Sequence, residues 1–255
     1  MSSTRVRFRF IILFAALLAM TACRQVQVIE PIATKAVIRV ELSPALAGWS
    51  ERLGACGARL ETSALNVETL PISQLSLDAS DLILRLGKKT GDEPYLGSPG
   101  SVSVQFLQHP GNPLQQLSLQ ELTTILSGET THWDDVGAEG MDSAGEGLPI
   151  QLVSLGADDD LTAWLRTAFL RGSELGVKTM VAGSAESLRK IVADTPGSFC
   201  LLPSQEFPGA GRALAVVDAN GNEITLAIPV LAITAGQPEQ DLRQLLLCLQ
   251  ESEID

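Results

Sequence analysis

Residues 38–44 read Ile38-Arg39-Val40-Glu41-Leu42-Ser43-Pro44. The first five alternate apolar and charged side chains with a period of two, which predicts a β-strand with one buried face. Serine followed by proline predicts a helix start, because serine caps helices and proline fits the first helical position. Apolar residues at helical spacing continue this helix to Gly54. A strand that runs directly into a helix is typical of α/β proteins.

Strands and helices continue to alternate along the chain. Further strands are predicted at residues 64–70, 81–86, 101–107, 150–155, 177–181, 198–202, 213–217, 223–228 and 230–233. Further helices are predicted at residues 118–127, 158–169, 184–193 and 239–250. Residues 88–100 are expected to form a loop, and Asn220-Gly221 is the best hairpin signal. This order predicts an α/β fold with mainly parallel sheets.

The N-terminus resembles a secretory signal that ends in a lipid-attachment cysteine. Three arginines precede the apolar run Ile11–Met20, which is too short for a permanent span of about 20 residues. The ending Leu18-Ala19-Met20-Thr21-Ala22-Cys23 resembles the bacterial lipobox, which implies acylation of Cys23 and a lipid anchor on the outer face of a membrane. An ordinary signal cut near Ala22, with Cys23 unmodified, is the alternative.

Charge excludes several partners. Removing residues 1–22 removes three arginines and no acids, so the formal charge moves from −12 to −15. Nucleic-acid binding is therefore not expected, and the membrane link should be the lipid alone, because an acidic protein is repelled by anionic lipid. A hydrophobic content of 45% indicates a folded protein with one large domain or two modest ones.

No catalytic, metal or cofactor motif is recognisable. His109 and His132 are the only histidines, and neither lies in a nucleophile motif, so both are expected to be structural and the chain is not expected to be an enzyme. The acids of residues 158–160 are contiguous, whereas calcium loops space theirs alternately. Gly87-Lys88 lacks the upstream glycine of a phosphate-cradling loop.

Three segments resemble one family. Residues 112–137 contain an Asn-Pro pair, a Leu-Ser helix start, a short helix ending at Gly128 and a tryptophan, Trp133, five residues later. Residues 196–203 read Pro-Gly-Ser-Phe-Cys-Leu-Leu-Pro. Together with Ser43-Pro44-Ala45-Leu46, these segments resemble the type II periplasmic solute-binding proteins of the phosphate-binding kind.

The resemblance implies a two-lobed fold in which the chain crosses between lobes near residues 106–110 and again near Pro203. The expected division is a signal peptide at 1–22, a spacer at 23–35, lobe 1 at 36–107 plus 204–255, and lobe 2 at 108–203. It also implies a monomer that captures a small molecule, such as phosphate, between the lobes and delivers it to an ABC-type importer. An extracytoplasmic sensor or adaptor with a degenerate cleft is the alternative.

Candidate ligand-binding residues follow from strand ends and helix starts, which bind anions through unpaired N–H groups. They are Ser43, Ala45, Gly87, Lys88, Ser154, Asp158 and Asp159. Where the family carries an arginine and a Ser-Gly-Thr triplet, this chain has Ser154 and Asp159-Asp160-Leu161. Carboxylates there repel phosphate, which favours a cationic or neutral ligand, or another oxyanion held by lobe 1.

Cys56, Cys200 and Cys248 remain if Cys23 carries lipid. Because Cys56 and Cys248 both fall in lobe 1, they are the preferred disulfide pair in an oxidising compartment. Buried unpaired thiols are the alternative.

Overall fold

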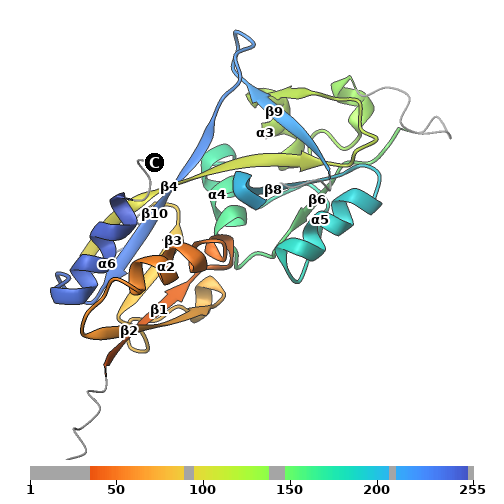
Figure 1. The fold of residues 1–255 in the computed structure, drawn as a ribbon. Helices are drawn as coiled ribbons and strands as arrows, with labels where there is room; N and C mark the ends of the chain where they lie inside the picture. The colour runs from red at the N-terminus through yellow and green to blue at the C-terminus, as the bar shows by residue number, and fades with distance from the viewer. Residues whose placement is uncertain (1–34, 89–94, 138–146, 207–210, 252–255) are drawn as a thin grey trace, which may run out of the picture. The chain divides into compact units, whose positions relative to one another are not determined.

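The computed structural model describes residues 35–88, 95–137, 147–206 and 211–251 (Figure 1). All of these residues belong to one compact unit, Lys35–Asp255. The predicted signal segment and Cys23 precede residue 35 and lie outside the described residues. None of the helices in these ranges has the length and apolar character needed to cross a bilayer.

The predicted strand-to-helix junction lies at Ser43. Strand β1 (Ala36–Leu42) ends there, and a 3-10 turn, η1 (Pro44–Leu46), precedes helix α2 (Trp49–Gly57). The prediction of one continuous helix to Gly54 is therefore wrong. The Ser43 side chain makes no capping bond, and the Leu46 N–H donates to the Ser43 carbonyl, so the first turn closes with the tighter 3-10 pattern.

Ten strands among the described residues form the sheet, in the order β2-β1-β3-β10-β4-β8-β6-β7, with β9 pairing to both β4 and β5. Their bounds are β2 (Ser63–Thr69), β3 (Leu82–Leu86), β4 (Tyr95–Gln108), β5 (Gln116–Ser118), β6 (Gln151–Ser154), β7 (Thr179–Val181), β8 (Ser198–Pro203), β9 (Arg212–Val217) and β10 (Leu226–Thr234). The expectation of an α/β fold is confirmed.

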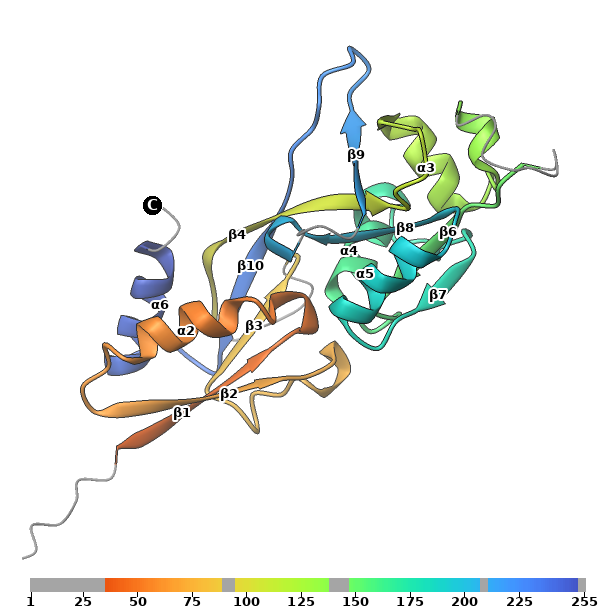
Figure 2. The ribbon, with the colours of Figure 1, turned by 45° about the vertical axis from the view of Figure 1, so that its right-hand side comes forward.

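The sheet is parallel in its outer parts and antiparallel at its centre. Strand β1 pairs in parallel with β2 and β3, and β6 does so with β7 and β8. Strand β10 runs antiparallel to β3 and β4, and β4 runs antiparallel to β8 and β9. Figure 2 shows β4 and β10 as the long strands that connect the two groups of parallel strands.

Strand β4 begins at Tyr95, inside the segment predicted to be a loop, so that prediction is wrong for residues 95–100. Its glycines and Pro99 are unfavourable for a strand on local grounds. Residues of β10 nevertheless pair with this half of β4, and a register shift between Val230 and Ala232 accommodates the irregular sequence.

Strand β9 pairs with residues 106–108 of β4 and in parallel with β5. The Asn220-Gly221 turn forms, with the Gly221 N–H donating to the Asp218 carbonyl at 3.0 Å. The two strands predicted after it are a single strand, β10, which continues through Pro229 and pairs with β3 and β4. The lobe boundaries stay a prediction.

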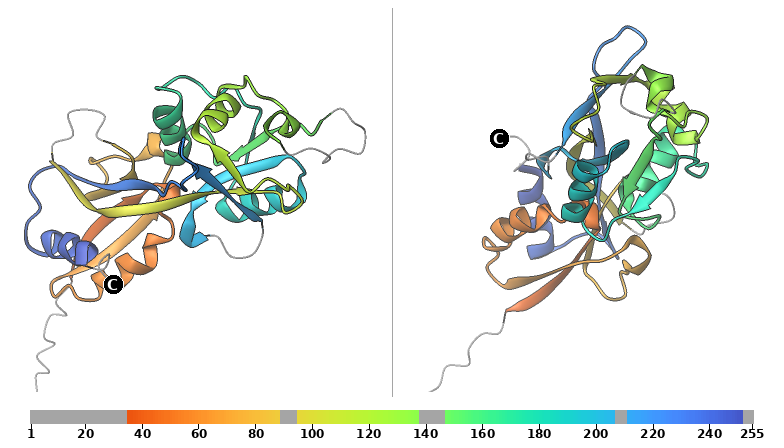
Figure 3. Two further views of the ribbon diagram at one scale, coloured as in Figure 1. Left: turned by 90° about the horizontal axis from the view of Figure 1, so that it is seen from above. Right: turned by 90° about the vertical axis from the view of Figure 1, so that its right-hand side faces the viewer.

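Helices α2 and α6 (Gln240–Glu251) pack against each other (Figure 3). The disulfide Cys56–Cys248 joins them across 192 residues of sequence, which confirms the preferred pair. The guanidinium of Arg52 lies 4.4 Å from the centre of the Trp49 ring and donates a hydrogen bond to the Leu249 carbonyl. Cys200 is buried and unpaired.

Two of the three segments that carry the resemblance, residues 112–137 and 196–203, contact each other. Helix α3 (Leu119–Ser127) opens with the predicted capping box of Ser118 and Glu121, and Gly128 ends it in the left-handed conformation. In η3 (Trp133–Val136), the fully buried Trp133 donates its indole N–H to the Gly197 carbonyl at 2.8 Å. These contacts of the motif residues stabilise the fold.

The remaining helical elements are η2 (Ile72–Gln74), α4 (Asp160–Phe169), α5 (Ala185–Asp194) and η4 (Ser204–Glu206). A hydrophobic core runs continuously from β1 and β3 through β4 to β6 and α4. A smaller cluster lies between β6, β8 and α5. The larger core contains Leu86 at the end of β3 and Leu161 in the first turn of α4, and so holds both in place.

Candidate ligand-binding site

The candidate site lies where β3 ends and α4 begins. Asp160 is the first residue of α4, and its side chain is only 2% exposed. Its Oδ2 atom accepts a hydrogen bond of 2.7 Å from the backbone N–H of Leu86, the last residue of β3. Because these residues are 74 positions apart in sequence, the bond links two distant segments directly.

Ser43 lies beside the same carboxylate. The residue is fully buried, and its backbone N–H donates to the Leu84 carbonyl at 2.9 Å. Its hydroxyl is close enough to Asp160 to lower the pKa of that carboxyl, although it forms no hydrogen bond of normal geometry with any described residue. Ala45 is buried in η1, next to this point.

Burial raises the pKa of Asp160 above its ordinary value. The Ser43 hydroxyl, the Leu86 N–H and the positive charge of Arg85 oppose this shift, and the negative charge of Asp158 adds to it. The carboxylate is thus removed from water but surrounded by donors and a cation.

A second link joins the start of α4 to the segment after β2. The backbone N–H of Ser73 donates to Asp158 Oδ1 at 3.0 Å, and the Ser73 hydroxyl donates to Asp158 Oδ2. The Ile72 N–H also lies 3.4 Å from the Asp158 carbonyl oxygen. Asp158 is exposed, so this link is weaker than the buried one.

Asp159 faces the other way. Its Oδ2 atom caps α4 by accepting the N–H groups of Leu161 and Thr162 at 3.1 and 3.2 Å, while Oδ1 is buried without a partner among the described residues. Burial raises its pKa to about 6, and the charge of Asp160 adds to that shift. With Ser154, Asp159 lines a void of only about 10 Å³, too small for a solute.

A cavity of about 410 Å³ opens beside Asp160. The end of β3 and the following loop contribute Arg85, Leu86, Gly87 and Lys88. The first turns of α4 contribute Asp160, Ala163, Trp164, Thr167 and Ala168, and Ile72 completes the wall. The cavity is therefore mainly apolar, with two cationic side chains and one carboxylate.

A neighbouring cavity of about 400 Å³ shares Ile72 and Arg85 but has no lining residue from α4. The cavity of about 410 Å³ is lined by both β3 and α4, the two segments that the hydrogen bond between Asp160 and Leu86 links. It is therefore the better candidate for a site at strand ends and a helix start.

The structure gathers only some of the predicted site residues. Gly87 and Lys88 line the cavity, and Ser43 and Asp158 lie at the two links around Asp160. Ser154 and Asp159 lie on the far side of the α4 start and do not line it. Whether any of the predicted residues binds a ligand stays a prediction.

Sequence reasoning missed Asp160, Arg85 and Trp164 as lining residues. Asp160 was visible only as one of three consecutive acids, and no local pattern tells which of them faces the cavity. Trp164 was interpreted only as part of a helix and Arg85 only as part of a strand. Tertiary packing brings both side chains to the same cavity, and no local sequence pattern shows this.

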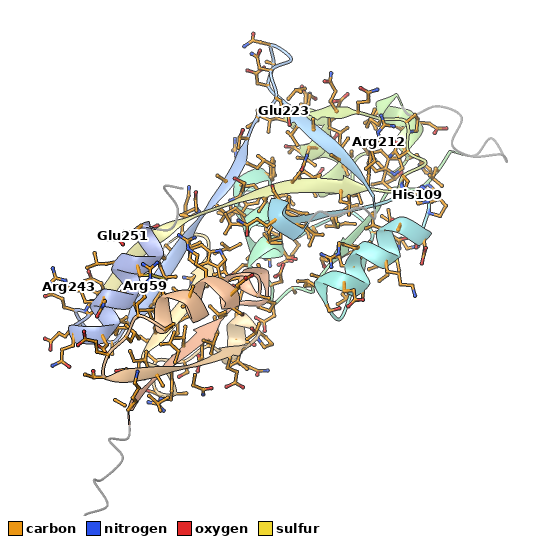
Figure 4. The ribbon with its side chains drawn as sticks, in the orientation of Figure 1. Arg59, His109, Arg212, Glu223, Arg243 and Glu251 are labelled. Carbon is orange, nitrogen blue, oxygen red and sulfur yellow. A yellow bond between two sulfur atoms is a disulfide. The ribbon has the colours of Figure 1, made fainter. Side chains whose placement is uncertain are left out.

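Most ionisable groups labelled in Figure 4 lie away from this junction. His109 and Arg212 lie near the end of β4, and Arg59, Arg243 and Glu251 lie around α2 and α6. The His109 Nδ1 atom accepts the Gly111 N–H at 3.0 Å, in keeping with a structural role.

Residues 101–235, more than half of the chain, match the family model of the PBP superfamily domain. This chain belongs to the PBP superfamily. A search of curated protein sequences found no match. Membership in this family of binding domains confirms that the chain is a binding protein and not an enzyme.

Solved structures share the PBP superfamily fold with this chain. A putative phosphate ABC transporter substrate-binding protein from Clostridium perfringens, with bound phosphate, has a TM-score of 0.66 at 14% identity, over 84% of this chain and 92% of that one. An ABC-type phosphate transport receptor from Vibrio cholerae has a TM-score of 0.63 at 14% identity, over 85% and 94%.

The regulatory domain of MetR, a LysR family regulator from Neisseria meningitidis, has a TM-score of 0.59 at 13% identity, over 86% of this chain and 95% of that one. At these identities the likenesses establish the fold alone. They confirm the expected type II periplasmic-binding-protein architecture.

Proposed function

We propose that this chain is an extracytoplasmic solute receptor that holds a small organic molecule in the cavity beside Asp160 and delivers it to an ABC-type importer. The observation that carries the proposal is the cavity itself, which brings an apolar wall and two cationic side chains to the junction of β3 and α4. Its volume of about 410 Å³ falls within the range of small-molecule sites.

The lining favours an organic anion over free phosphate. Ile72, Leu86 and Trp164 offer apolar contact, while Arg85 and Lys88 attract a carboxylate or a phosphate ester. A bare phosphate ion gains nothing from apolar walls and fills little of this volume. We therefore infer a ligand with one anionic group and an apolar part.

Two features support an extracytoplasmic location. The Cys56–Cys248 disulfide persists in oxidising compartments. The N-terminal segment has the basic, apolar and small-residue order of a secretory signal, and Cys23 follows it. We propose that Cys23 carries the lipid anchor and that the receptor acts as a monomer.

A sensor without a transport role is the second candidate. The structural likeness to the MetR regulatory domain favours it, because that domain belongs to a regulator. Both candidates require the same cavity to bind a solute. The two candidates differ in solute uptake by cells that lack this protein but keep the permease. Loss of uptake in these cells supports the receptor, whereas an unchanged uptake rate supports the sensor.

The binding test uses Trp164 as a reporter, since it lines the cavity. The full chain in detergent is titrated with apolar carboxylates, phosphate esters, inorganic phosphate and polyamines while tryptophan fluorescence and melting temperature are recorded. An organic anion is expected to change the fluorescence and raise the melting temperature. The Trp164→Phe variant should lose the fluorescence change but keep a thermal response.

Lys88→Ala should weaken binding of the same anion about tenfold, the size expected for one charge-assisted hydrogen bond. Lys178→Ala is the matched control, because Lys178 is exposed and does not line the cavity. No response to any compound, or an equal loss in both lysine variants, would contradict the proposed site.

A further inference from the structure

Asp160 places a carboxylate beside three groups that are suited to an anion. The Leu86 N–H donates to it at 2.7 Å, the Ser43 hydroxyl lies beside it, and the positive charge of Arg85 acts on it. A backbone N–H, a hydroxyl and a guanidinium form a typical set of donors for an oxyanion. Here the oxyanion comes from the chain itself.

The burial of Ser43 is a second, independent sign. Its hydroxyl is fully buried and has no hydrogen bond of normal geometry to any described residue. Buried hydroxyls nearly always have a partner, so an unsatisfied one marks a position suited to a further acceptor. The acceptor beside it is the Asp160 carboxylate.

We propose that Asp160 is a tethered carboxylate that fills an oxyanion position between Ser43 and Leu86, and thereby excludes small free oxyanions from it. Because Asp160 belongs to α4 and Leu86 to β3, the same contact holds these segments together in the absence of solute. Selectivity at the junction then comes from a residue that occupies the position, not from one that repels ligand at a distance.

Asp160 lies at the same junction as the proposed binding cavity. The role given to Asp160 rests on the proposed function only in that an organic solute is taken to enter the adjoining cavity. The anion test needs no organic solute. The two can therefore fail separately.

Removal of the carboxylate should create an anion site. In Asp160→Ala the Leu86 N–H loses its acceptor and the Ser43 hydroxyl loses the carboxylate beside it, while Asp159 still caps α4. The vacated space adjoins the cavity, so a small anion can reach it. Formate matches the deleted group in size, inorganic phosphate is a larger oxyanion, and chloride controls for ionic strength.

The experiment compares the full-length wild type with Asp160→Ala in detergent and records the melting temperature against formate and phosphate at fixed ionic strength. The wild type should not respond beyond the chloride control. Asp160→Ala should show a saturable rise of about 3 °C or more with formate. Adding Ser43→Ala should weaken the formate response about tenfold, because one donor is lost.

Two controls separate the position of Asp160 from a general loss of negative charge. Asp160→Asn keeps an oxygen acceptor in the same place and leaves no space, so it should not respond to formate. Asp158→Ala removes the neighbouring carboxylate that bonds Ser73 rather than Leu86, and it should not respond either.

Several results would overturn the inference. They are a saturable phosphate or formate response in the wild type, an equal response in Asp158→Ala, or none in a folded Asp160→Ala. If Asp160→Ala does not fold in chloride, it is refolded in formate. Recovery of the native tryptophan spectrum then supports the inference, and failure at every concentration contradicts it.

Discussion

Asp158, Asp159 and Asp160 are consecutive in the chain, yet their side chains contact three different parts of the molecule. Asp158 bonds Ser73, Asp159 caps its own helix, and Asp160 bonds the end of β3. The start of α4 causes this divergence, because successive side chains at a helix start point in different directions. A run of equal charges thus supplies one exposed link, one cap and one buried link.

Asp159 should make the stability of the protein depend on pH. Its pKa is raised by burial from 3.8 to about 6, so the folded state holds this proton more tightly than the unfolded state does. Its neutral form stabilises the fold fully below about pH 4. That contribution is lost as the pH rises to about 6, by on the order of 3 kcal/mol.

In Asp159→Asn the carboxyl group is replaced by an amide that stays neutral at every pH, and asparagine also caps helices well. The free energy of unfolding of Asp159→Asn relative to wild type should therefore increase between pH 4 and pH 7. Urea denaturation at each pH measures it. Asp158→Asn controls for the loss of one charge, and parallel curves for Asp159→Asn and wild type would refute the shift.

Among the elements, α2 and α6 are joined covalently although they lie at opposite ends of the described chain. The Cys56–Cys248 disulfide closes a loop with a sequence separation of 192. Such a bond restricts the unfolded chain strongly, and the effect grows with loop length. The bond thereby ties α6, which contacts β4, to α2, which contacts β2.

Replacing both cysteines in a Cys56→Ser, Cys248→Ser double variant should lower the free energy of unfolding by about 4 kcal/mol. Chemical denaturation with and without a reducing agent measures it, and reduced wild type should match the double variant. Cys200→Ser is the control, because Cys200 is buried and forms no disulfide. The difference in unfolding free energy between Cys200→Ser and wild type should be the same with and without the reducing agent. A wild type that is insensitive to reduction would count against the bond.

For the whole molecule, we propose that the N-terminal segment attaches the chain to the membrane. The strong net negative charge disfavours attachment to anionic lipid by charge alone. Because Cys23 follows the apolar run of the N-terminal segment, we propose that a lipid on Cys23 attaches the protein to the membrane. Cys23 lies outside the described residues, so this is argued from sequence alone.

Cys23→Ser should move the protein from the detergent phase to the aqueous phase in a detergent-partition experiment, because no acyl chain can then be attached. Ser50→Ala, a change at an exposed position of α2, should leave partition unchanged. Mass spectrometry of the wild type should find a lipidated N-terminal Cys23 peptide. An unmodified peptide would refute the anchor.

Local patterns predicted the elements whose cause is local. The capping box at Ser118 and Glu121, the left-handed Gly128 and the strand before Ser43 each depend on neighbouring residues, so their signals were in the sequence. The α/β order followed from these signals. The pairing of Cys56 with Cys248 was a preference that the fold confirmed.

Tertiary contacts determined the rest. Strand β4 extends to Tyr95 through glycines and a proline only because β10 lies beside it to pair. Asp160, rather than Asp159, faces the cavity because Leu86, 74 residues away, offers its N–H there. Local propensity acts over a few residues, whereas the strands, donors and walls that form this site meet only after the sheet has assembled.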